Sequence, residues 1–342
     1  MITYAPKWIR SDERSSRVIH VDRTALLRRP LNRQIAAKLL GRGATSKRAD
    51  ICRPLRFAHP RLILEHRLME ESMKSNAKWQ LSGSAANLYE SYLVPTIFIP
   101  WANHLIERAQ PQSGEYVLDV ACGTGIVARL VKDKVGKEGR VVGVDLNADM
   151  LNVARSISIA SKVNIEWIEA DVGNVPLPDN SFDIAFCQQG LQFFPDKIGA
   201  LTEIRRLLRP NGRCVICVAQ ELKKNPLMRS QVEAITEHIN AEASTAIRAV
   251  CALSDGEIIR KMFLQAGFQD VAWDTVSLTL HHDSGLEFVT NGIASTPVAG
   301  LITDWSDEAR GALIEGILAG FGDYYDGTAL RFPHVSSVVI AS

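Results

Sequence analysis

The 342-residue chain contains no apolar run long enough to cross a bilayer. Its six cysteines show no disulfide framework, which is typical of a reducing compartment and predicts a cytoplasmic protein. Its eight histidines occur without the cysteine or carboxylate spacing of a metal site, so we expect no bound metal. The net charge is only +1. What remains is a chain with 46% hydrophobic residues, enough to bury one or two cores.

The small net charge conceals a basic N-terminal segment. Residues 1–75 hold 17 of the 39 Lys and Arg side chains but 7 of the 38 Asp and Glu side chains, so the rest of the chain is acidic. We interpret this segment as a poorly ordered leader. A basic arm for nucleic acid and a targeting peptide are the alternatives, although the early Asp12, Glu13 and Asp22 argue against targeting. Residues 76–342 are expected to form the working domain.

A nucleoside-binding βαβ unit begins at Val117. A short apolar run predicts a buried strand, which leads through Gly123 and Gly125 into an amphipathic helix. Glycine allows a backbone to approach a ligand closely. A second apolar run ends in Asp145, which is placed to bind the hydroxyls of a ribose. With Ala128 in third place, the turn also satisfies the dinucleotide fingerprint, so an NAD site remains open at this stage.

Polar residues follow two further predicted strands, at residues 164–169 and 182–187. They are Asp171 and Gln188. Because the carboxyl ends of parallel strands meet at one edge of a sheet, we expect both to lie near Asp145. The remaining predicted strands span residues 214–219, 271–280 and 335–341.

Five motifs now stand in order along the chain. They are Leu118–Gly125, Gly143–Asp145, Ala170–Asp171, Ser181–Asp183 and Leu208–Gly212. Together they closely resemble the class I S-adenosylmethionine (SAM) methyltransferases, within the small-molecule branch that includes the ubiquinone and menaquinone C-methyltransferases. The resemblance is dense over about residues 85–220 and thinner toward the C-terminus.

The resemblance implies an α/β, Rossmann-like fold. The expected sheet has seven mostly parallel strands, an antiparallel last strand and helices on both faces. Helical lid segments are expected near residues 84–110, 220–250 and 286–325.

The resemblance also implies a set of cofactor-binding residues, taken over position by position. The set comprises Asp119 and Gln188 near the methionine, Ala121, Gly123 and Gly125 in the loop under methionine and ribose, Asp145 at the ribose, Leu146, Asp171 and Val172 at the adenine, and Tyr92 in the lid. Ala121 stands where the usual loop has its first glycine.

The reaction that the resemblance implies is methyl transfer from SAM to a small, hydrophobic organic acceptor, at carbon, oxygen or nitrogen. No acid–base pair stands out, so the catalytic residues are unknown. A base would come from His104, His281, His282 or Tyr89. The acidic domain would repel phosphates, so we expect no nucleic-acid partner. A SAM-binding protein without transferase activity and an NAD-dependent oxidoreductase are the alternatives, and the sequence indicates no oligomeric state.

Overall fold

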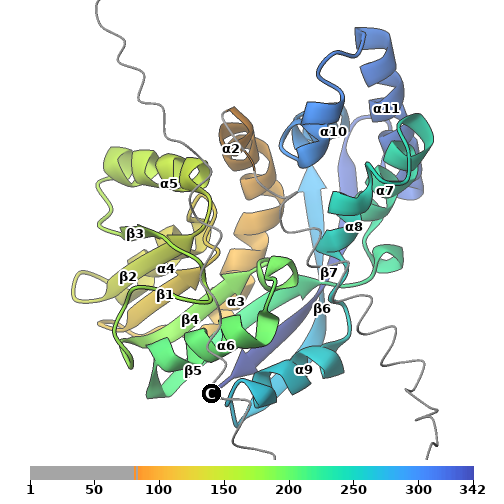
Figure 1. Ribbon diagram of the computed structural model, residues 1–342. Coiled ribbons are helices and arrows are strands. Elements are labelled where there is room, and N and C mark those ends of the chain that lie inside the picture. Colours follow the sequence, from red (N-terminus) through yellow and green to blue (C-terminus); the bar gives the residue numbers. More distant parts are fainter. Residues whose placement is uncertain (1–80, 82–83) are drawn as a thin grey trace, which may run out of the picture. The chain divides into compact units, whose positions relative to one another are not determined.

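A seven-stranded sheet runs through the part of the chain that the computed structural model describes, Leu81 and residues 84–342 (Figure 1). The predicted leader, residues 1–75, lies outside the described residues. The strands are β1 (Tyr116–Val120), β2 (Arg140–Asp145), β3 (Glu166–Glu169), β4 (Phe182–Gln188), β5 (Leu208–Ala219), β6 (Val271–His282) and β7 (Leu330–Ala341).

The strand order is β3-β2-β1-β4-β5-β7-β6. The first five strands in this order pair in parallel, and β7 is antiparallel to both of its neighbours. The predicted Rossmann-like sheet with an antiparallel last strand is therefore confirmed.

Two of the strands begin earlier than predicted. The segment from Leu208 to Gly212, which precedes the predicted strand at residues 214–219, is extended and opens β5. It bulges between the pairs Phe182–Leu208 and Ile184–Arg213. At the other end of the chain, β7 already begins at Leu330, because its first residues pair with the long β6.

Helices cover both faces of the sheet because successive strand residues point to opposite sides and both sides are apolar. On one face, Val117 and Ile184 pack in a core with α3 (Ile99–Ala109) and α4 (Ile126–Val135). On the other face, Leu118 packs in a core with α6 (Lys197–Leu207) and α9 (Gly256–Gln265).

The outer strands β2 and β3 are covered by α5 (Ala148–Ser161). Asn147 caps the start of this helix: its side-chain oxygen accepts hydrogen bonds from the backbone N–H groups of Asp149 and Met150. The cap holds the chain in place directly after Asp145.

Helical additions occupy each of the three predicted segments. They are α2 (Ser84–Leu88) and η2 (Tyr89–Phe98) before α3, then α7 (Pro226–His238) and α8 (Thr245–Val250), and finally α10 (Gly285–Ala294) and α11 (Asp307–Gly320). In Figure 1 the helices α7, α8, α10 and α11 gather near one end of β6 and β7, where α7 packs against α11 and α10 packs against η2. No helix in the described part of the chain has the length and apolar composition to cross a membrane.

Candidate functional site

The turn between β1 and α4 is bound to the end of β2. The Gly123 N–H donates to Asp145 Oδ2 at 2.7 Å, and the Asn147 N–H donates to Asp145 Oδ1 at 2.8 Å. Each carboxylate oxygen thus has capacity for a further hydrogen bond. Ala121 and Gly123 adopt positive φ angles of 53° and 55°. The turn therefore presents its backbone, with one shared carboxylate, to the space above the strand ends.

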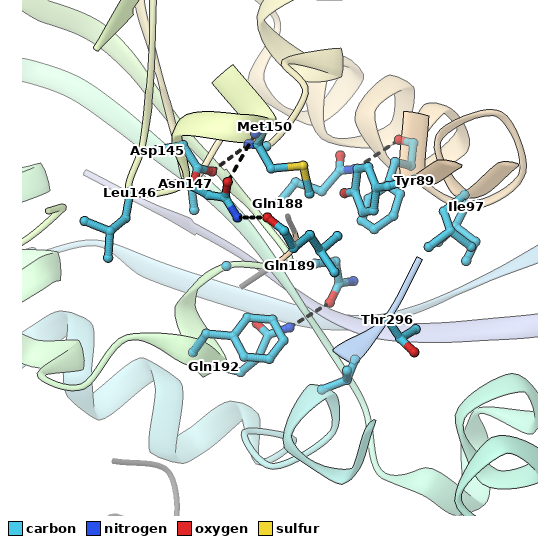
Figure 2. Close-up of a pocket in the computed structure, with 18 of the residues that line it drawn as sticks. Tyr89, Ile97, Asp145, Leu146, Asn147, Met150, Gln188, Gln189, Gln192 and Thr296 are labelled. Atoms are coloured by element: carbon cyan, nitrogen blue, oxygen red, sulfur yellow. Dashed lines mark hydrogen bonds between the residues drawn. The ribbon is translucent and has the colours of Figure 1, made fainter. Parts of the chain in front are cut away.

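A cavity of about 530 Å³ opens at these strand ends. Its size lies within the range of small-molecule sites. Figure 2 shows Asp145 and Leu146 on its wall, with Gln188, Gln189 and Gln192 following along the same wall. The wall away from the turn is mainly apolar and comes from η2, α7 and α8.

Most of the predicted cofactor-binding residues meet at this cavity. The lining contains Ala121, Gly123, Asp145, Leu146, Asp171, Val172 and Gln188. The Leu146 side chain is 58% exposed, an apolar surface of the kind that a flat ring covers. The wall does not include Asp119, Gly125 or Tyr92.

Gly125 is required by protein packing. A Cβ at this position would come within 2.1 Å of the Trp167 ring, and one at Gly143 would come within 2.3 Å of the same ring. At Gly123, by contrast, the nearest atom to an added Cβ is the Tyr89 hydroxyl at 3.8 Å. Gly123 thus leaves room on the cavity side of the turn, while Gly125 leaves room for a tryptophan.

Tyr89, three residues before the predicted Tyr92, is the tyrosine on the cavity wall. It begins the π-helix η2, which contains Pro95 and so lacks one backbone donor. Glu90, the next residue, forms an ion pair with Arg129 of α4 at 2.6 Å, and both side chains are largely buried. This pair joins η2 to the helix that follows the glycine turn.

Asp119 lies beneath the turn, almost completely buried, and accepts the Ala128 N–H at 2.9 Å. Burial, against the lowering effect of the hydrogen bond from the Ala128 N–H and with a smaller raising effect of the Asp145 charge, raises the pKa of Asp119 to about 7. Burial also raises the pKa of Asp145, against the lowering effect of the Asn147 and Gly123 N–H groups. Two carboxyl groups of this kind favour a cationic ligand over a pyrophosphate.

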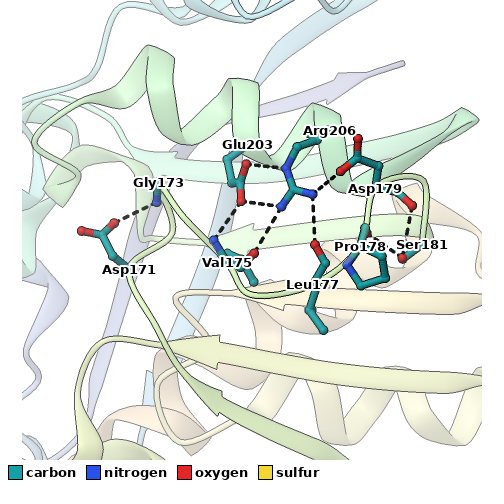
Figure 3. A network of polar contacts seen from close by, with 9 residues as sticks. All are labelled: Asp171, Gly173, Val175, Leu177, Pro178, Asp179, Ser181, Glu203 and Arg206. Atoms are coloured by element: carbon teal, nitrogen blue, oxygen red, sulfur yellow. Dashed lines mark hydrogen bonds and ion pairs between the residues drawn. The ribbon is translucent and has the colours of Figure 1, made fainter.

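The loop that carries Asp171 and Val172 is fastened to α6 by Arg206 (Figure 3). Arg206 donates to the carbonyls of Leu177 at 3.0 Å and Val175 at 3.2 Å, and it pairs with Glu203 at 2.6 Å. Glu203 in turn accepts the Val175 N–H at 2.8 Å. The hydrogen bond from Arg206 is the largest cause that lowers the pKa of Glu203. An irregular loop is thereby held in one conformation at the cavity edge.

Of the four candidate bases, only Tyr89 lines the cavity. Burial, followed by the charge of Asp145, raises the pKa of Tyr89 well above its ordinary value, so its phenol is neutral and is a weak base. His104, His281 and His282 are not on the wall. A histidine that the sequence analysis did not single out, His334 of β7, is on the wall. The sequence gives no clear signal for it, because it lies just before the predicted final strand at residues 335–341.

Residues 118–216 match the family model described as a methyltransferase domain. With the fold and the cavity, this match identifies a methyltransferase that resembles the class I SAM-dependent enzymes. The cofactor is SAM, and the reaction transfers its methyl group to a small organic acceptor. The match favours this assignment over the NAD-dependent oxidoreductase.

Several curated relatives are named for quinone methylation. A demethylmenaquinone methyltransferase of Staphylococcus epidermidis is 29% identical over 182 residues, which cover 50% of this chain and 75% of that protein. The ubiquinone/menaquinone biosynthesis C-methyltransferase UbiE of Pseudomonas savastanoi is 32% identical over 164 residues, covering 46% and 64%. Among solved structures, the YcgJ protein of a Bacillus is 20% identical and covers 70% of this chain and 96% of its own, with a TM-score of 0.46.

Proposed function

We propose that the cavity binds SAM at the strand ends and a small, apolar, quinone-like acceptor between the helices. The observation that carries this proposal is the difference in character between the turn side of the cavity and its helical side. Polar groups of the turn and strand ends, such as Asp145 and Gln188, give way to the side chains of Leu227, Met228 and Ile247. A cavity of this kind suits a polar cofactor next to an apolar acceptor.

The polar end fits SAM in three respects. Asp145 retains hydrogen-bonding capacity for the two ribose hydroxyls. Leu146 offers an apolar surface to the adenine, beside Asp171 and Val172. The Oε1 atom of Gln188 is buried and has no hydrogen-bond partner among the described residues. A turn of this amide toward the cavity would let the methionine ammonium group supply the donor that the oxygen lacks, which removes the cost of a buried, unpaired acceptor.

SAM supplies an electrophilic methyl group, so the chain itself mainly has to orient the acceptor and exclude water. The helical additions α2–η2, α7–α8 and α10–α11 are suited to this task as lid segments, because η2, α7 and α8 contribute the apolar wall and α10 packs against η2. Asp119 and Gly125 then hold the turn from beneath the cavity lining, and Tyr92 forms part of the lid segment η2.

We further propose that the protein is cytoplasmic and has no nucleic-acid partner. The five cysteines of the described residues are free, which suits a reducing compartment. After residue 75 the chain is acidic, which disfavours phosphate backbones.

The test is transfer of labelled methyl from SAM into an extract of the native cell, followed by separation of organic and aqueous phases. Label that enters the organic phase with the wild type, but not with Asp145→Ala, is the expected result. Label confined to the aqueous phase contradicts the apolar acceptor. Absence of label in both phases, with SAM bound, contradicts the transferase reaction in that cell.

A further inference from the structure

His334 is a nearly buried polar residue on the wall of a cavity that is largely apolar. It lies on β7, and its side chain is 4% exposed. The same cavity is lined by Leu227, Met228 and Ile247 from the helical additions. A buried imidazole among apolar side chains requires hydrogen-bond partners for its two nitrogens.

One imidazole nitrogen already has a partner. The indole N–H of Trp101, which is fully buried in α3, donates to His334 Nδ1 at 2.9 Å. The two rings meet edge-on with centroids 5.6 Å apart. An indole nitrogen can only donate, so His334 Nδ1 carries no proton. In a neutral imidazole the proton then resides on Nε2.

The imidazole is neutral at physiological pH. Burial lowers the pKa of His334 to about 4. Within the described part of the chain, Nε2 has no hydrogen-bond partner, although His334 lines the cavity. The ring therefore offers the cavity a fixed N–H donor and no free lone pair, which excludes it as the base of the reaction.

We infer that the Nε2–H of His334 donates a hydrogen bond to an oxygen atom of the methyl acceptor. The acceptor is then an apolar ring that carries a hydroxyl or carbonyl oxygen. This inference rests on the proposed function and specifies its acceptor. The donor orients the oxygen and stabilises negative charge that develops on it, as a neutral donor does in a low-dielectric site. His334 binds and orients the acceptor without exchanging a proton.

Two probes and three proteins test the inference by calorimetry, with S-adenosylhomocysteine present to prevent turnover. The probes are 1,4-dihydroxynaphthalene, which carries ring oxygens, and naphthalene, which carries none. The proteins are the wild type, His334→Leu, which removes the donor, and His334→Gln, which retains an N–H donor at the same reach. One neutral hydrogen bond corresponds to a loss of about 3- to 10-fold in affinity.

We expect His334→Leu to bind dihydroxynaphthalene more weakly than the wild type by this factor, and His334→Gln to recover most of that affinity. Naphthalene should bind all three proteins with the same affinity. Equal losses for both probes would show a role in shape alone and overturn the inference. So would a wild type that binds dihydroxynaphthalene no better than naphthalene. The affinity for SAM is measured on the same proteins, and its absence in the wild type counts against the proposed function instead.

Nitrogen-15 NMR of labelled histidine provides a readout that needs no acceptor. The His334 signals, identified by their loss in His334→Gln, should show a protonated Nε2 and an unprotonated Nδ1, with no titration between about pH 5.5 and 8.5. In Trp101→Phe this fixed tautomer should give way to a mixture. A His334 that titrates near its ordinary pKa, or that carries its proton on Nδ1, overturns the inference.

Discussion

Alanine substitution at Gly123 should weaken SAM binding while it leaves the fold nearly intact. The added methyl group meets no atom closer than the Tyr89 hydroxyl at 3.8 Å, so it projects into cavity space. The cost to the fold is that of a non-glycine residue at a φ of 55°, about 1–2 kcal/mol. For a domain of this size, the melting temperature then falls by about 2–8 °C. Crowding of a bound ligand costs about 1–3 kcal/mol, or about 5- to 150-fold in affinity.

Gly125→Ala is the matched control, because it lies two residues along the same turn. Its Cβ would overlap the Trp167 ring at 2.1 Å, at a φ of 83°. Displacement of the ring adds about 1–3 kcal/mol to about 1–2 kcal/mol of backbone strain. This variant should lose more stability than Gly123→Ala, and its folded fraction should lose less affinity for SAM.

Calorimetric melting without ligand and titration with SAM measure the two effects separately. The reasoning is refuted if Gly123→Ala binds SAM as the wild type does. It is refuted equally if Gly125→Ala melts at the wild-type temperature, because Trp167 would then not be packed against the turn.

Three further changes probe the site. Asp145→Asn should weaken SAM binding by about 10- to 100-fold through loss of charge-assisted hydrogen bonds, whereas the exposed Asp133→Asn should leave the calorimetric affinity unchanged. Because the pKa of Asp119 is raised to about 7, the folded state binds its proton more tightly than the unfolded state, and stability falls as pH rises from about 4 to 7. Asp119→Asn should therefore be more stable than the wild type at about pH 8, by at most about 4 kcal/mol, and little changed at about pH 4, as urea unfolding measures. Arg206→Ala should raise the KM for SAM several-fold with kcat unchanged, since it releases the Asp171 loop; an unchanged KM would contradict that role.

The strand-end residues could be predicted from the sequence because their position depends on simple geometry. Asp145, Asp171 and Gln188 each follow a predicted parallel strand, and parallel strands place their carboxyl ends at one edge. The structure brings all three to one cavity. The fold was predictable for the same reason, since apolar runs and turns alternate along the chain.

The features that the sequence analysis could not predict depend on contacts between distant segments. Gly125 leaves the space that the Trp167 ring occupies. Trp167 belongs to another strand, and no local sequence pattern connects it with the turn. Tyr89 faces the cavity in place of Tyr92 because η2 is a π-helix, whose side-chain positions differ from those of an α-helix. His334 precedes the predicted start of the last strand, and its partner Trp101 lies 233 residues away.

The most direct test of the central claim is a comparison of SAM and NAD⁺ binding to the same wild-type preparation by calorimetry. A site with two carboxyl groups at the glycine turn should bind the cationic SAM, lose most of that affinity in Asp145→Asn, and bind the pyrophosphate of NAD⁺ far more weakly. Tighter binding of NAD⁺ than of SAM would contradict the account.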